Sequence, residues 1–101
     1  MILVTGTMPL QPAQQEAALD AVRTLQAHTR TEPGCHAYRF ALDIDEPHLL
    51  RVHEEWEDDE SMQAHLATPQ FADFIERIGD KLAGAPDVTR WDGAVGRPLF
   101  E

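Results

Sequence analysis

The sequence has 101 residues, of which 43% are hydrophobic, and this suits one compact domain with an ordinary core rather than a disordered chain. Eight Lys and Arg stand against eighteen Asp and Glu, which gives a formal charge of −10. A chain this acidic, with no cluster of basic residues, is a poor partner for nucleic acid or an anionic membrane surface, so we expect neither.

Cys35 is the single cysteine, which excludes an internal disulfide and a cysteine-rich zinc site. The start of the chain lacks the basic and long apolar regions of a signal peptide. No apolar run approaches the ~20 residues that a membrane span needs. We therefore expect a cytoplasmic protein with no membrane attachment. We expect a single domain over residues 1–101, with a core over 1–95 and a C-terminal tail over 96–101.

The first half of the chain predicts a strand and a helix. Residues 2–8 form a short, β-branched and apolar run that is typical of a strand. A helix is predicted from Gln11 to about Arg30, with Pro12 suited to its first turn. The Glu-Pro-Gly run at residues 32–34 then ends the helix and turns the chain. The apolar stripe of this helix contains Ala18, Val22 and Leu25.

A hairpin is predicted next. Alternating residues from Cys35 to Asp43 indicate a second strand, and a third runs from His48 to Trp56. Acidic residues and a proline over residues 43–47 separate the two runs, which favours an antiparallel turn.

A broken helix and a last strand follow the hairpin. Asp58 or Asp59 can cap the helix, and the Thr-Pro pair at residues 68–69 predicts a break with a fresh cap. The helix then resumes to about Lys81. The last strand is predicted over residues 88–95.

This order of elements predicts a ferredoxin-like α+β fold, βαββαβ, with an antiparallel sheet. Helices are expected to cover one face of the sheet. The other face also carries apolar groups, so we expect it to be buried against a second copy in a symmetric dimer of two sheets.

Three short motifs support this prediction. They are residues 32–35 (Glu-Pro-Gly-Cys) before an aromatic strand, residues 54–58 (Glu-Glu-Trp-Glu-Asp), and residues 65–71 (His-Leu-Ala-Thr-Pro-Gln-Phe). Together they resemble the antibiotic biosynthesis monooxygenase (ABM) domain, a branch of the dimeric α+β barrel proteins, over nearly the whole chain. The resemblance implies an ABM-like domain that forms a homodimer, with a small cavity in each subunit between the sheet and its helices.

The resemblance implies more than one chemistry. Members of the family include cofactor-independent monooxygenases that oxidise phenolic or quinol compounds to quinones, an isomerase of a phosphorylated signalling sugar, and haem-degrading enzymes. The haem-degrading branch uses a histidine late in the second long helix and an asparagine on the first strand. The matching positions here hold Phe74, Ile75 and Glu76, and Thr5, Gly6 and Thr7. These departures argue against haem, and we expect no cofactor.

Trp56 and His65 are the starting point for a site hypothesis. If the strand that ends at Trp56 packs against the helix that carries His65, both rings can face one pocket. Trp56 offers a flat apolar wall with an N–H donor for a substrate ring, or it packs in the core at the strand end. His65, with an unperturbed pKa of ~6.5, is a candidate general base, or it is a partly exposed helix histidine.

Further candidates follow from strand alternation. Glu54 faces the same way as Trp56, and it can orient His65, hold a proton if it is buried, or pair with an arginine. Tyr38 and His36 are expected to share the strand face toward the helices and to donate hydrogen bonds to a quinone-like oxygen. The expected walls of the pocket, which equally suit a plain core, are Met62, Phe71 and Phe74.

We predict a cofactor-independent monooxygenase that uses molecular oxygen to oxidise a small aromatic or quinol substrate to a quinone. Two alternatives stay open: an isomerase or proton-transfer enzyme that acts on a small carbonyl compound, and a non-catalytic ligand-binding dimer. We expect no metal site, because alternation sends His53 and Glu54 to opposite faces of their strand. No phosphate loop or dinucleotide fingerprint is present in the sequence.

Overall fold

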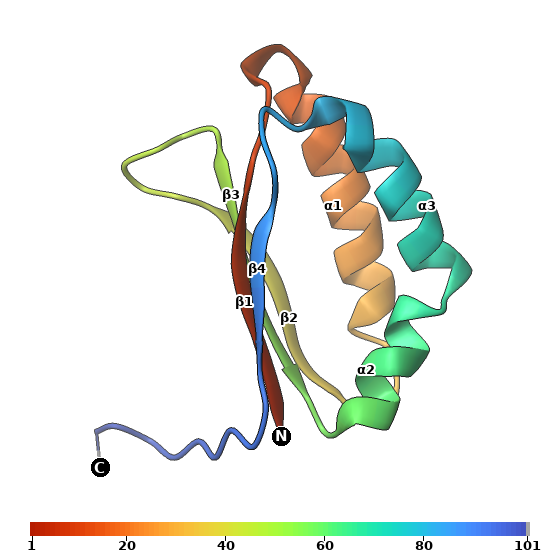
Figure 1. Ribbon diagram of the computed structural model, residues 1–101, viewed down its shortest axis with the longest axis vertical. Coiled ribbons are helices and arrows are strands. Elements are labelled where there is room, and N and C mark those ends of the chain that lie inside the picture. The colour runs from red at the N-terminus through yellow and green to blue at the C-terminus, as the bar shows by residue number, and fades with distance from the viewer. Residues whose placement is uncertain (101) are drawn as a thin grey trace.

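A computed structural model describes residues 1–100, and Glu101, the last residue of the expected tail, lies outside the described residues (Figure 1). The strands are β1 (Ile2–Pro9), β2 (Cys35–Leu42), β3 (Leu49–Trp56) and β4 (Asp87–Trp91). The helices are α1 (Gln15–Thr29), α2 (Asp59–Leu66) and α3 (Pro69–Ile78), with short 3₁₀ helices η1 (Pro12–Gln14) and η2 (Gly79–Lys81).

The four strands form one antiparallel sheet in the order β2-β3-β1-β4. Helices α1, α2 and α3 all cover the same face of the sheet, and the opposite face carries no helix (Figure 1). The predicted ferredoxin-like α+β fold is therefore confirmed. Within residues 1–100, no helix has both the length and the apolar character that crossing a membrane requires.

The two short helices begin where the sequence predicted. The Asp58 carboxylate accepts a hydrogen bond from the backbone N–H of Ser61 at 2.8 Å and caps α2. The Thr68 hydroxyl accepts one from the N–H of Phe71 at 3.2 Å and caps α3, with Pro69 in the first turn. These two caps divide the region into two separate helices, α2 and α3.

Three predicted boundaries differ in the structure. The helix expected from Gln11 starts as the 3₁₀ helix η1, and the helix expected to reach Lys81 ends its α-helical part at Ile78 and continues as η2. The last strand stops at Trp91 rather than near residue 95. Gly93 explains this early end, because its φ of 70° belongs to a turn conformation that a strand cannot contain.

The core lies between the sheet and the helices. Side chains from β1, β2, β3 and all three α helices bury themselves there, and Trp56 at the end of β3 is completely buried. The uncovered face of the sheet carries Leu3 of β1 beside the exposed Trp91 of β4, which are register partners. Beyond β4 the chain leaves the body of the molecule, and Val95, Leu99 and Phe100 are exposed (Figure 1).

Candidate functional site

A pocket of about 500 Å³ lies between the sheet and helices α2 and α3. This volume is within the range usual for small-molecule sites, and most of its walls are apolar. All four strands contribute side chains to it. Six of the eight predicted site residues line it: Tyr38, Glu54, Met62, His65, Phe71 and Phe74.

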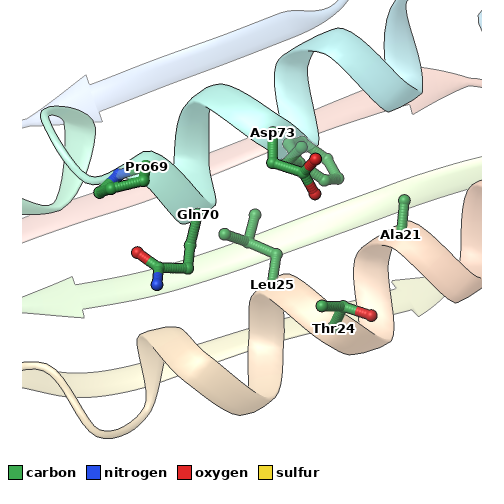
Figure 2. Close-up of a pocket in the computed structure, with 7 residues that line it drawn as sticks. Ala21, Thr24, Leu25, Pro69, Gln70 and Asp73 are labelled. Atoms are coloured by element: carbon green, nitrogen blue, oxygen red, sulfur yellow. The ribbon is translucent and has the colours of Figure 1, made fainter.

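A second hollow, of about 240 Å³, lies between α1 and α3, where side chains of the two helices face each other (Figure 2). Asp73 is its only ionisable lining residue, and Phe74 lines both hollows and so separates them. Its remaining lining residues are Ala21, Thr24, Leu25, Pro69 and Gln70. Because several proton-handling groups gather in the larger pocket and one carboxylate in this one, the larger pocket is the candidate functional site.

His65 occupies the centre of the candidate site. Its ring lies 4.9 Å from the Trp56 ring, 5.2 Å from the Tyr38 ring and 5.1 Å from the Phe71 ring, measured between centroids. Nδ1 lies 2.9 Å from Oε1 of Glu32, and the His65 side chain is 1% exposed. Burial lowers the pKa of His65, although the Glu32 carboxylate acts in the opposite direction. A neutral imidazole of this kind can accept a proton from a bound molecule.

The turn between α1 and β2 brings Glu32 to His65. Gly34 in this turn has a φ of 80°, and a Cβ atom on it would collide with the Ser61 side chain. A glycine is therefore required for both the backbone conformation and the close approach of the turn to α2. The backbone N–H of Glu57 donates to the Gly34 carbonyl at 2.8 Å and ties the turn to the end of β3.

Glu54 and Trp56 form a second polar pair beside the pocket. The Trp56 indole N–H donates to Oε1 of Glu54 at 2.9 Å. Burial raises the pKa of the Glu54 carboxyl, against the opposing effect of this hydrogen bond. Glu54 thus faces the pocket with one oxygen engaged by Trp56. The carboxylate beside Nδ1 of His65 belongs to Glu32. The sequence pattern had offered Glu54 as a candidate to orient this histidine.

Tyr38 lines the same pocket, and its hydroxyl lies beside the side chain of Thr29. Its ring packs against the rings of Trp56 and Phe40 as well as His65. Burial, followed by the charge of Glu54, strongly raises the pKa of Tyr38. The phenol therefore stays neutral and keeps its O–H as a hydrogen-bond donor.

Two predicted site residues do not line the pocket. His36 is exposed and lies 2.6 Å from Glu57, because a register shift between Cys35 and Ala37 interrupts the alternation that was expected to align His36 with Tyr38. Trp56 packs against His65 but lies behind it in the core. Its ring thus contacts His65, and its N–H donates to Glu54.

Three polar or charged residues at the site were not among the sequence-based candidates. Glu32 was interpreted as part of a helix-ending turn and of a family motif, without a role at the site, and no local pattern links it to His65, which lies 33 positions away. Arg90 of β4 lines the pocket and binds Asp59 at 2.7 Å, and the alternation of β4 could have placed it there. Gln63 also lines the pocket. In the part of the chain that the structure describes, no group of three His, Cys, Asp or Glu side chains could hold a metal ion.

Comparisons with known proteins agree with this fold. A protein of Pseudomonas aeruginosa is 27% identical, with a TM-score of 0.82, over 89% of this chain and 90% of that one. A structure described as an antibiotic biosynthesis monooxygenase is 27% identical, with a TM-score of 0.87, over 94% of this chain and all of the other. A conserved protein of Methanosarcina mazei Go1, 21% identical, shares the fold with a TM-score of 0.86 over 89% of each chain.

The fold and the pocket define a ferredoxin-like α+β protein with a pocket of small-molecule size between sheet and helices. The family model for antibiotic biosynthesis monooxygenase matches residues 1–77, and the chain belongs to that family. An uncharacterized protein of Synechocystis sp. is 30% identical over 87 residues, which is 86% of this chain. This chain spans 59% of the length of that relative. The predicted family is thus confirmed, and membership points to a monooxygenase-like or small-molecule-binding role.

Proposed function

We propose that the protein is a cofactor-independent monooxygenase that oxidises a small phenolic or quinol compound to a quinone. The observation that carries the proposal is the environment of His65. Its neutral imidazole lines an apolar pocket of about 500 Å³ and is held by a carboxylate from the side away from the pocket. A base of this kind is what removal of a phenolic proton requires.

The walls of the pocket suit a flat aromatic ring. Phe71, Phe74 and Met62 offer apolar contact surface, while Tyr38 and Glu54 supply polar groups on the sheet side. A ring bound between these walls is shielded from water, and water would otherwise quench a reactive intermediate.

The chemistry balances without a cofactor. The phenolic proton passes to Nε2 of His65, and the phenolate gives one electron to molecular oxygen, which forms a phenoxyl radical and superoxide. In a phenol whose para carbon carries hydrogen, the two combine at that carbon, and the resulting peroxide takes the proton back from His65. Loss of the ring C–H proton with cleavage of the O–O bond then gives the quinone and one water. One phenol and one oxygen molecule are consumed, and the substrate supplies every electron. A quinol instead gives oxygen two electrons and two protons, which yields the quinone and hydrogen peroxide.

Oxygen uptake with a panel of one-ring and two-ring phenols and hydroquinones tests this proposal. We expect one oxygen consumed per quinone formed and a loss of roughly 100-fold or more in kcat for His65→Gln, since a general base contributes about 10²–10⁴. His48→Gln is the matched control, because His48 is exposed and its ring bonds Gln15 at 2.6 Å, on another part of the surface. No uptake by the wild type with any compound, or full activity of His65→Gln, would refute the mechanism.

A second function is favoured by one specific observation. The pKa of Glu54 is raised and that of His65 is lowered, although both groups line one pocket. A carboxyl that keeps its proton to higher pH and an imidazole that stays neutral to lower pH can serve as acid and base in proton transfer on a small carbonyl compound. Such an isomerase would consume no oxygen, so the same uptake experiment separates it from the monooxygenase. A ligand-binding dimer without activity would bind ring compounds and convert none.

We further propose that the molecule acts as a cytoplasmic homodimer whose uncovered sheet faces pair into a barrel. The apolar pair of Leu3 and Trp91 on that face supports this arrangement, as do the exposed apolar residues of the tail. Light scattering should give twice the mass of the 11.3 kDa chain. A monomer at micromolar concentration would remove the dimer from the proposal and leave the pocket chemistry unaffected.

A further inference from the structure

The pair formed by Glu32 and His65 is largely buried. The two side chains are 11% and 1% exposed, and 2.9 Å separates Oε1 from Nδ1. Glu32 comes from the turn after α1, whereas His65 lies on α2, so the pair joins two elements that are distant in sequence. Removing either side chain would leave the other buried without this hydrogen bond, which costs free energy of folding.

Glu32 approaches His65 from the side away from the substrate pocket. It lines a separate outer hollow of about 280 Å³ and is not among the residues that line the large pocket. His65 lines both. A ligand in the large pocket therefore contacts His65, and any influence of Glu32 on that ligand passes through the imidazole.

The second oxygen of Glu32 strengthens this interpretation. Oε2 is buried and has no hydrogen-bond partner among residues 1–100, and its nearest basic neighbour is Nε2 of His28 at 3.3 Å. A buried carboxylate oxygen without a hydrogen bond is costly, and a group of this kind calls for an explanation, such as a functional role. The one side-chain hydrogen bond that Glu32 makes is the one to His65.

This geometry determines the tautomer of His65. A carboxylate only accepts hydrogen bonds, so the ring nitrogen that faces it must carry the proton. Neutral His65 is then protonated at Nδ1, and the lone pair is at Nε2. No side chain within residues 1–100 bonds to Nε2, which leaves this atom available to a molecule in the pocket.

We propose that Glu32 is the positioning residue of the site: it holds the Nδ1–H tautomer and the ring orientation of His65 so that Nε2 presents its lone pair to the substrate. The kinetic part of this inference rests on the proposed oxidation, and the structural part does not. Titratable groups face His65 from each neighbouring element, and the test must account for them. They are His28 of α1, Glu32 of the turn, Tyr38 of β2, Glu54 of β3, Arg90 of β4, and Asp58 and Glu60 near the start of α2.

Long-range ¹H–¹⁵N spectra of histidine-labelled protein, recorded across a pH series, test the inference without any substrate. In the wild type we expect His65 in the Nδ1–H form. In Glu32→Ala we expect the Nε2–H form that a free imidazole prefers, together with a lower pKa of His65. A wild-type His65 protonated at Nε2, or an unchanged tautomer in folded Glu32→Ala, would overturn the proposal.

Glu32→Gln covers the case in which the alanine variant does not fold. Its amide oxygen still accepts from Nδ1–H, but the negative charge that raises the pKa of His65 is gone. We expect an unchanged tautomer and a measurably lower pKa of His65, and an unchanged pKa would contradict the proposal. Glu57→Gln is the matched control, because Glu57 bonds the exposed His36 at 2.6 Å, and it should leave His65 unchanged.

Kinetics separate this inference from the proposed function. If the enzyme oxidises a phenol, Glu32→Ala should lower kcat roughly 10- to 100-fold, part of the effect of the base, and leave KM within about twofold. A changed tautomer in a protein that oxidises nothing would support the positioning role and refute the oxidation. If the wild type oxidises a phenol but its His65 is protonated at Nε2, the oxidation is supported and the positioning role is refuted.

Discussion

Two histidine–carboxylate pairs of this protein, His65–Glu32 and His36–Glu57, differ in environment far more than in length. The nitrogen–oxygen distances are 2.9 and 2.6 Å, so the exposed pair is the shorter. The side chains of the first pair are 1% and 11% exposed, and those of the second are 47% and 61% exposed. Water can replace either partner of the exposed pair at little cost, whereas the buried His65 has Glu32 as its one side-chain hydrogen-bond partner within residues 1–100. Burial rather than bond length therefore marks the pair that the fold depends on.

Replacing the histidine of each pair provides the strongest test of this comparison. His65→Leu leaves the Glu32 carboxylate buried without its partner, and we expect the free energy of unfolding to fall by about 3 kcal/mol. His36→Leu should change it by less than about 0.5 kcal/mol, as is usual at an exposed position. Urea unfolding of both variants gives the two values. Equal losses would show that the enclosure of the His65–Glu32 pair has no energetic consequence.

A smaller loss is expected when the turn that delivers Glu32 is disturbed. Gly34→Ala places a side chain at a φ of 80° and against Ser61, which should cost about 1–3 kcal/mol. Gly79→Ala is the matched control, because Gly79 has a φ of −56° and nothing within 4 Å of an added Cβ. Alanine there is expected to be neutral or to stabilise by up to about 1 kcal/mol. If the two alanine variants unfold at the same urea concentration, the close approach of the turn to α2 does not constrain the fold.

The sequence predicted the features that depend on neighbouring residues. Asp58 and the Thr68–Pro69 pair predict the starts of the two short helices, because a capping side chain bonds within the first turn of its own helix. Strand alternation likewise placed Tyr38 and Glu54 toward the helices, where both line the pocket.

Features that depend on tertiary structure were not predictable in the same way. Glu32 meets His65 only because a turn closes onto a helix far along the chain. The bulge at His36 moves one side chain outward, and a single irregularity of this kind leaves no clear mark in the alternating pattern. Alternation also gave the correct face for Trp56 but could not tell whether its ring would border the pocket or fill the core behind it.

The smallest effect we expect is a dependence of stability on pH that belongs to the buried pair. The pKa of folded His65 lies below the value of about 6.5 that an unfolded histidine has, so below that pH the unfolded chain binds more protons than the folded one. The contribution of His65 is therefore complete above about pH 6.5 and is lost as the pH falls. Its slope cannot exceed about 1.4 kcal/mol per pH unit, the limit for one proton.

Glu54 acts with the opposite sign, which decides how this dependence must be measured. Its raised pKa makes the folded state bind more protons than the unfolded one, so its contribution is lost as the pH rises from about 4.5. The wild-type slope between pH 4.5 and 6.5 is then a sum of the two, and the difference between wild type and His65→Gln isolates the histidine. Urea unfolding at several pH values should show stability decreasing more steeply with acid in the wild type than in His65→Gln. Parallel curves would mean that the buried imidazole is protonated as readily in the folded state as in the unfolded one. In that case the surroundings of His65 would not hold it neutral.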